Sequence, residues 1–265
     1  MNNPMNVKKN HLFLITLILG SLLSLSLSYG QKNAQQYYQL KVYHFDTTTQ
    51  QPRVERFLEE AYLPAMHRAG IKQVGVFTTI EDEAPKVYVF IPYTSWEQIV
   101  QIDQALGKDK KYQQAGSDYL EAAHDTPPYE RIETLLLHAF PGMPSPEAPS
   151  LAGPRSERFY ELRSYEGPTE KLYANKVDMF NKGDEVSIFD RLGFNAVFYA
   201  EVLFGSRMPN LMYMTAFENR AERDEHWDAF NSDPAWQKLR AMDQYQNNVS
   251  KADLIFLRPA EYSDF

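Results

Sequence analysis

Two groups of residues in this chain have side chains that could do chemistry, and the first is centred on His226. His226 stands beside Trp227 and Phe230 on a predicted helix, and Glu222 lies four residues earlier. A histidine next to an apolar face, oriented by a carboxylate, could act as a general base or bind a ligand. The same spacing also suits a partly buried histidine in an ion pair with Glu222. His226 is therefore a candidate catalytic group, with a purely structural role as the alternative.

The second group lies on two matching strand-like segments, Tyr37 to Phe45 and Arg158 to Glu166. If the alternating residues Tyr38, Leu40 and Leu162 face the helices, the polar residues between them line the space between two sheets. Cations and tyrosines there could hold a carboxylate or an enolate. An internal ion-pair network is the alternative. Together with two helical residues, the candidate ligand-binding set is Lys41, Tyr43, Glu161, Arg163, Tyr165, His226 and Trp227.

The chain carries none of the short motifs that identify the commonest enzyme classes. A G-x-S-x-G sequence, a phosphate-binding loop, a dinucleotide fingerprint and an H-E-x-x-H sequence are all missing. The chain has no cysteine, which excludes disulfide bonds, thiolate catalysis and cysteine-based zinc sites. We therefore predict no metal ligands and no cofactor for this protein.

The composition indicates a globular protein with an acidic surface. Of the 265 residues, 43% are hydrophobic, which is enough for one or two compact domains with their own core. The formal net charge is −8, and the basic residues form no stripe. Because nucleic-acid binding depends on clustered Lys and Arg, we predict no nucleic-acid partner.

Residues 1–30 have the pattern of a signal peptide. A short basic region precedes the apolar run Leu12 to Leu19, and Ser28-Tyr29-Gly30 supplies the small residues of a cleavage site. A lipid-anchored export signal is excluded because it needs a cysteine. We predict cleavage, a periplasmic or secreted mature protein, and no stable membrane span afterwards. An uncleaved transmembrane anchor is the alternative.

The remaining chain repeats one order of elements twice: strand, helix, strand, strand, helix, strand. Residues 38–43 match residues 160–165 at an offset of 122, and residues 105–112 match residues 229–236 at an offset of 124. A stretch with five prolines and two glycines separates the copies and is predicted to be a linker. The predicted domains are a first ferredoxin-like repeat at 31–140, the Pro-rich linker at 141–154 and a second ferredoxin-like repeat at 155–265.

A single ferredoxin-like sheet carries helices on one face only, yet the predicted strands are apolar on nearly both faces. The second face must therefore be buried against another sheet. The predicted fold class is α+β, with two ferredoxin-like β-α-β-β-α-β repeats forming an intramolecular dimeric α/β-barrel. Within it, Pro64 is expected to kink or end a helix that begins at Arg53. A single helix is expected from about Thr169 to Arg191.

Several of these features resemble NIPSNAP proteins, which are tandem members of the dimeric α/β-barrel superfamily. They are the repeated half-domain, the run Glu201-Val202-Leu203-Phe204-Gly205 before the third strand, and Asn231-Ser232-Asp233-Pro234-x-Trp236. The resemblance covers Tyr37 to the C-terminus. It implies the barrel fold, and the wider superfamily includes cofactor-independent monooxygenases and haem-binding enzymes. Related sequences often place a histidine in the strand around Met212 to Ala216, and this chain has none there.

The sequence favours binding over catalysis. We expect an exported NIPSNAP-like protein that binds a small apolar or aromatic ligand, or a protein partner, through its barrel scaffold. Assembly into a homo-oligomer is a further expectation. The alternative is a cofactor-independent monooxygenase- or isomerase-type enzyme that acts on a small aromatic or apolar substrate.

Overall fold

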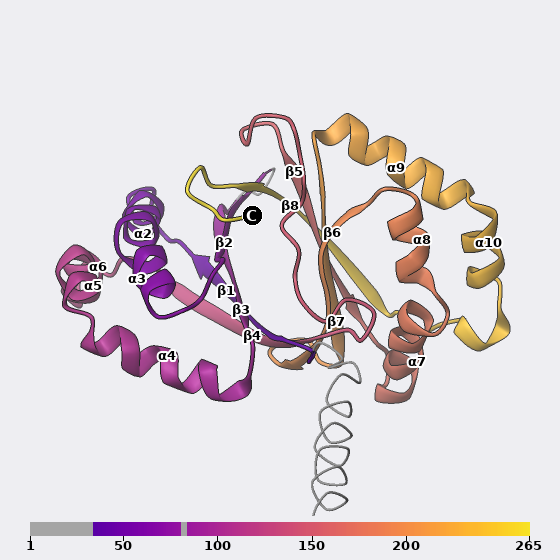
Figure 1. Ribbon diagram of the computed structural model, residues 1–265, viewed down its shortest axis with the longest axis horizontal. Coiled ribbons are helices and arrows are strands. Elements are labelled where there is room, and N and C mark those ends of the chain that lie inside the picture. The colour runs from indigo at the N-terminus through magenta and orange to yellow at the C-terminus, as the bar shows by residue number, and fades with distance from the viewer. Residues whose placement is uncertain (1–33, 81–83) are drawn as a thin grey trace, which may run out of the picture. The chain divides into compact units, whose positions relative to one another are not determined.

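The computed structural model describes residues 34–80 and 84–265 (Figure 1). The chain divides into a unit Met1–Ala34 and a unit Gln35–Phe265, and the second unit contains every element described below. The predicted signal peptide at residues 1–30 lies outside the described residues. Among the described residues, no helix has the length and apolar character needed to cross a membrane.

The first repeat follows the predicted order of strands and helices. Its strands are β1 (Tyr37–His44), β2 (Gly75–Thr79), β3 (Lys86–Tyr93) and β4 (Arg131–Ala139). Between β1 and β2 run α2 (Gln50–Phe57), the π-helical turn η1 (Leu58–Tyr62) and α3 (Leu63–Arg68). Between β3 and β4 run α4 (Trp96–Lys108), α5 (Lys110–Ala115) and α6 (Ser117–Leu120).

The second repeat has the same order. Its strands are β5 (Phe159–Glu166), β6 (Asn195–Phe204), β7 (Asn210–Phe217) and β8 (Lys251–Pro259). Between β5 and β6 run α7 (Glu170–Asn181) and α8 (Glu185–Arg191). Between β7 and β8 run α9 (Arg220–Ser232), α10 (Pro234–Arg240) and the 3₁₀ turn η2 (Asp243–Tyr245).

The strands close into one barrel in the order β1-β3-β2-β8-β5-β7-β6-β4. The sheet of the first repeat joins the sheet of the second along two seams, where β2 pairs with β8 and β4 pairs with β6, both antiparallel. Closure leaves neither sheet with an open edge. The helices of the two repeats lie on opposite sides of the barrel (Figure 1). The predicted intramolecular dimeric α/β-barrel is confirmed.

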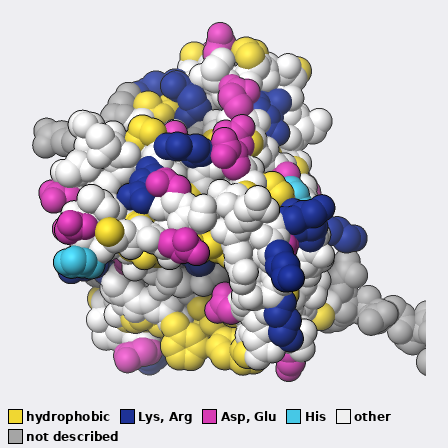
Figure 2. All heavy atoms as spheres, turned by 90° about the vertical axis from the view of Figure 1, so that its left-hand side faces the viewer, with side chains coloured by type: hydrophobic (Ala, Val, Ile, Leu, Met, Phe, Trp, Pro, Cys, Tyr) yellow, Lys and Arg dark blue, Asp and Glu magenta, His cyan; other side chains and the backbone are white. Residues whose placement is uncertain are grey.

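The side of the unit that carries the first-repeat helices has charges of both signs. Figure 2 shows Lys and Arg side chains interspersed with Asp and Glu, and hydrophobic side chains gathered at the lower edge. Trp96 of α4 and Phe204 of β6 are 46% and 63% exposed, and their ring centroids lie 6.5 Å apart.

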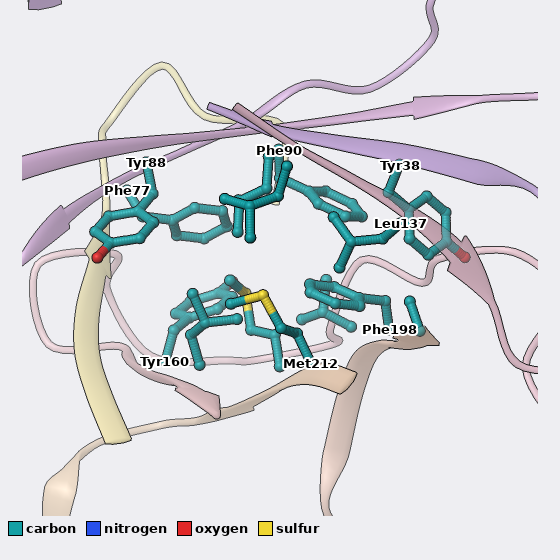
Figure 3. Packing of buried hydrophobic residues seen from close by; sticks show 14 of the residues in the cluster. Tyr38, Phe77, Tyr88, Phe90, Leu137, Tyr160, Phe198 and Met212 are labelled. Carbon is teal, nitrogen blue, oxygen red and sulfur yellow. The ribbon is translucent and has the colours of Figure 1, made fainter. Parts of the chain in front are cut away.

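Large apolar side chains from both sheets fill the barrel interior (Figure 3). Tyr38 and Phe90 of the first repeat are fully buried, as are Tyr160 and Phe198 of the second. The Phe90 and Phe198 rings stack with their centroids 4.8 Å apart. Burial of each such ring is worth roughly 2–3 kcal/mol, so the shared core holds the two repeats together.

This core contradicts the predicted placement of the polar strand residues. Tyr38, Leu40 and Leu162 belong to the barrel interior, and therefore Lys41 and Arg163 face the helices. Both faces of these strands are buried, one by the opposite sheet and one by helices, so alternation alone could not say which face was which. The polar group is consequently split in two, with one part under the helices of each repeat.

The first helical segment does not end at Pro64, which was one of the two expected outcomes, but it is distorted just before this residue. In a regular α-helix the ring of Pro64 would collide with the carbonyl of Glu60. The chain instead widens into the π-helical turn, in which the N–H of Leu63 donates to the carbonyl of Leu58. The wider turn accommodates the proline, so the helix runs on to Arg68.

The helix expected from Thr169 to Arg191 is two helices. After α7, Gly183 and Asp184 turn the chain before α8 begins, and Asp184 has a φ of 68°. A side chain at Gly183 would collide with the carbonyl oxygen of Met179, so this turn requires glycine. The break packs α8 back against α7.

Residues 141–154 contain neither helix nor strand, as predicted, but they are firmly held. The carboxylate of Glu218 accepts hydrogen bonds from the backbone N–H groups of Ala152 and Gly153, at 2.6 and 2.7 Å. Leu151 packs against the barrel core. The segment is therefore an ordered strap across the second repeat.

Candidate functional site

A cavity of about 390 Å³ lies between the sheet and the helices of the second repeat. Strands β5 and β7 form its floor, and α7, α8, α9 and α10 form its walls. The volume is at the lower end of the range for small-molecule sites. Six aromatic rings line it: Tyr165, Phe189, Tyr213, Trp227, Phe230 and Trp236. We refer to it as the second-repeat cavity.

Glu161 of β5 anchors the charged side of this cavity. Its side chain is fully buried, and its carboxylate accepts hydrogen bonds from Arg163 Nε at 2.6 Å and Trp227 Nε1 at 2.8 Å. Arg223 of α9 donates to it twice, at 2.7 and 2.9 Å. The Arg163 guanidinium also lies 3.5 Å from the Trp227 ring. A buried carboxylate is tolerated because it is paired in this way.

Arg163 places unused hydrogen-bond donors at the cavity floor. Of its five N–H groups, Nε donates to Glu161 and one on Nη1 donates to the Tyr165 hydroxyl at 3.0 Å. No other described residue accepts a hydrogen bond from it. The Tyr165 hydroxyl lies 2.9 Å from that of Tyr213. Burial raises the pKa of Tyr213 well above its usual value, so this phenol stays protonated.

A second ion pair lies in the wall formed by α7 and α8. Lys176 Nζ donates to Glu185 Oε2 at 2.8 Å, and the side chains are only 7% and 3% exposed. In one continuous helix these residues would lie about 13 Å apart along the axis, so the break after α7 is what brings them together. Burial raises the pKa of the Glu185 carboxyl, and Lys176 partly offsets that rise.

Asp233 and Arg191 position Trp236. Asp233 caps α10 by accepting the backbone N–H groups of Ala235 and Trp236 at 2.9 and 3.1 Å. Arg191, the last residue of α8, donates twice to Asp233 at 3.0 Å. The Trp236 Nε1–H is buried, and no described group accepts its hydrogen. Such a donor carries a free-energy cost until an acceptor reaches it.

The structure does not bring His226 into this site. Its ring packs against Phe194 and Phe217, with centroids 5.6 Å away in each case. Its Nδ1 lies 2.8 Å from the backbone carbonyl of Glu222, whose carboxylate accepts the backbone N–H of Glu218 instead. The predicted ion pair between His226 and the Glu222 side chain is therefore wrong, and His226 packs in the hydrophobic layer beside the cavity.

The first repeat is filled where the second is hollow. Lys41 Nζ lies 3.5 Å from the Tyr62 hydroxyl, and the Tyr119 hydroxyl donates to that of Tyr43 at 3.4 Å. The Phe57 ring stacks on Tyr119 with centroids 3.7 Å apart, beside a hollow of about 20 Å³. That space holds about one water molecule. Burial lowers the pKa of Lys41. Lys41 and Tyr43 are thus separated from the second-repeat cavity.

Of the predicted set, the structure brings together Glu161, Arg163, Tyr165 and Trp227, on the helix-covered face of the sheet rather than between the two sheets. Sequence reasoning missed Lys176, Glu185 and Arg223 and treated Trp236 only as part of a structural motif. One signal was available. Lys176 stands with Tyr173, Val177 and Phe180 on the apolar stripe of its helix, where a lysine is rarely buried without a partner.

The fold and this cavity define a class of protein, an α/β-barrel built from two ferredoxin-like repeats in one chain. Three solved structures share the fold. A putative monooxygenase from Lactobacillus acidophilus NCFM has a TM-score of 0.56 and 9% identity, over 85% of this chain and 94% of that one. A putative monooxygenase from Fusobacterium nucleatum subsp. nucleatum ATCC 25586 has a TM-score of 0.55 and 7% identity, over 85% of this chain and 93% of that one. An anthrone oxidase-like protein has a TM-score of 0.50 and 9% identity, over 86% of this chain and 93% of that one.

At these identities the likeness shows the fold alone. Residues 160–264, which lie in the second repeat, match the NIPSNAP family. The match confirms, for the second repeat, the resemblance to NIPSNAP proteins expected from the sequence motifs. No curated protein matches the chain in sequence.

Proposed function

We propose that the protein binds a small planar aromatic molecule in the second-repeat cavity. The observation that carries this proposal is the lining of the cavity, in which aromatic rings form the walls and unused donors lie at the floor. The Trp227 and Trp236 rings both pack on Phe230, with centroids 5.4 and 4.6 Å away, so the wall is continuous. Rings arranged in this way favour a flat aromatic ligand.

The polar groups indicate what this ligand carries. Arg163 has N–H groups that no described residue uses, and Trp236 has a buried Nε1–H without an acceptor. An oxygen acceptor on the ligand would satisfy donors that are otherwise buried at a cost. The ligand is therefore an oxygen-bearing aromatic molecule rather than a pure hydrocarbon.

The same cavity favours a second candidate function, that of a cofactor-independent monooxygenase- or isomerase-type enzyme. Lys176, Glu185 and Tyr213 converge on the cavity, and such groups can hold or move a proton. His226, which the sequence offered for this work, lies outside the cavity. Export through the predicted signal peptide, a homo-oligomer and a protein partner stay predictions from the sequence.

We expect one aromatic probe to bind per chain. With 4-nitrophenol, tryptophan fluorescence should be quenched saturably, and calorimetry should give a single site because the first repeat is filled by its own tyrosines. Trp236→Phe, which removes the unpaired Nε1–H and shortens the wall, should weaken binding by about tenfold, equivalent to about 1.4 kcal/mol.

The matched control is Tyr112→Phe, because Tyr112 occupies the corresponding position of the first repeat at the offset of 124. This variant should bind the probe with unchanged affinity. Two sites per chain, equal losses in both variants, or no saturable binding by the wild-type protein would each contradict the proposal.

A further inference from the structure

We propose that Glu185 accepts a proton from the ligand, so that the second-repeat cavity takes weakly acidic phenols and enols and holds them as their conjugate bases. This inference rests on the proposed function and deepens it. It assigns a role to Glu185 and names the chemical class of the ligand.

Glu185 has one carboxylate oxygen that no described residue uses. Its Oε2 accepts from Lys176 Nζ at 2.8 Å, whereas no described residue donates to Oε1. The side chain is 3% exposed and lines the cavity. A carboxylate oxygen without a donor is costly in a poorly solvated cavity, and an O–H group on a ligand would supply that donor.

Hydrogen-bond donors line the cavity together with Glu185. Arg163 lines the floor and keeps N–H groups that no described residue uses, and Trp236 lines the wall and has a buried Nε1–H without an acceptor. A molecule that satisfies both sides presents an acidic O–H to Glu185 and a second oxygen to these donors. Phenols with an electron-withdrawing oxygen substituent and enols beside a carbonyl have this pattern.

The transfer balances without any other reactant. The O–H bond of the ligand breaks and its electron pair stays on the ligand oxygen, while the proton forms an O–H bond on Glu185 Oε1. The negative charge moves from the carboxylate to the ligand, so the total charge of the cavity does not change. Lys176 and Arg163 then face an oxyanion, which they stabilise electrostatically.

The surroundings favour Glu185 as the acceptor. Burial raises the pKa of its carboxyl, and therefore its proton affinity lies closer to that of an acidic phenol. Burial also raises the pKa values of Tyr199 and Tyr213 well above their usual range, so both phenols stay protonated. The charged and titratable groups that face Glu185 or line the cavity with it are Lys176 from α7, Arg163 and Tyr165 from β5, Tyr199 from β6, Tyr213 from β7, and Arg223, Asp224 and Asp228 from α9.

Two other ligand classes fit less well. A carboxylic acid arrives already ionised, and its charge would stand beside the ionised Glu185 in a poorly solvated space. A ligand without an acidic hydrogen leaves Glu185 Oε1 without a donor. The weakly acidic phenol or enol satisfies the site and keeps its charge constant.

A pH titration of bound 4-nitrophenol tests the inference, because the phenolate absorbs visible light and the phenol does not. In the wild-type protein the bound probe should be phenolate at least about one pH unit below the midpoint of the free probe, which is a tenfold shift in its ionisation. Infrared difference spectra of the complex should show the C=O stretch of a protonated carboxyl group.

The control variant is Lys176→Met with Glu185→Gln, which removes the acceptor and keeps the net charge of the pair at zero. Removing both partners of a buried pair is often nearly neutral for stability, so this variant should fold. It should bind the probe as the phenol and lack the carboxyl band. Trp236→Phe should bind more weakly and keep the shift.

The outcomes separate the two proposals. A wild-type protein that binds the probe in its protonated form overturns the role of Glu185 and leaves the binding function standing. An equal shift in the double variant, or a phenolate complex without the carboxyl band, also overturns that role. A wild-type protein that binds no probe overturns both.

Discussion

Glu161→Gln is expected to lower the free energy of unfolding by about 3–5 kcal/mol, which is the usual cost of breaking a buried ion pair by removing one partner. The substitution leaves Arg163 and Arg223, whose side chains are 12% and 16% exposed, without their shared carboxylate. It also puts an amide where the carboxylate accepted the Trp227 Nε1–H. The substitution should therefore weaken the contacts between strand β5 and helix α9, including the contact with Trp227 in the cavity wall.

Thermal unfolding of the variant should show a melting temperature lowered on the order of 10 °C for a protein of this size. Glu225→Gln is the matched control, because Glu225 lies on the same helix α9 and is exposed. It should leave the melting temperature unchanged. Equal melting temperatures for wild type and Glu161→Gln would contradict the anchoring role given to Glu161.

Lys176→Met is expected to destabilise the protein in a pH-dependent way. The substitution removes the cation that offsets the effect of burial on Glu185, so the pKa of the carboxyl rises further in the folded state. In the unfolded chain the same carboxyl titrates near 4.5. A folded pKa above the unfolded one gives stability that is complete below the unfolded pKa and is lost as the pH rises toward the folded pKa.

The expected loss in the free energy of unfolding, relative to wild type, depends on how far the pH lies above the unfolded pKa of Glu185. At about 1.4 kcal/mol per pH unit, it should reach up to about 3 kcal/mol at pH 7 and shrink as the pH falls toward the unfolded pKa. Denaturant unfolding across that range measures it. Adding Glu185→Gln should restore most of the stability at pH 7.

Lys182→Met provides the control, because Lys182 pairs with Asp178 at the end of the same helix and is 82% exposed. An exposed pair of this kind contributes little, so this variant should show no such pH dependence. A loss for Lys176→Met that is the same at every pH would mean that the substitution acts through packing rather than through the charge of Glu185.

The fold could be predicted because its signals are local and repeated. Matching strands and helices at nearly constant offsets indicate a duplicated β-α-β-β-α-β unit, and closure of the barrel follows from strands that are apolar on both faces. Because both faces of these strands are buried, the sequence could not show which face lies in the barrel interior and which lies under the helices. Tyr38 and Lys41 alternate correctly, but the sequence does not say whether sheet or helix covers each face.

The site was harder to predict because it depends on long-range packing. Lys176 and Glu185 meet only because Gly183 and Asp184 break a helix that the apolar pattern predicts to be continuous. The sequence indicates that Glu161 pairs with Arg163. It does not indicate that Glu161 also binds the guanidinium of Arg223, which is 62 residues away. His226 was singled out by its residue type, yet its ring is used for packing.

A crystal structure of the protein soaked with 4-nitrophenol tests the central claim most directly. We predict one probe molecule per chain in the second-repeat cavity, with its ring against Trp227 and Trp236 and its phenol oxygen within hydrogen-bond distance of Glu185 Oε1. An empty second-repeat cavity, with the probe bound in the first repeat or only on the outer surface, would contradict the account.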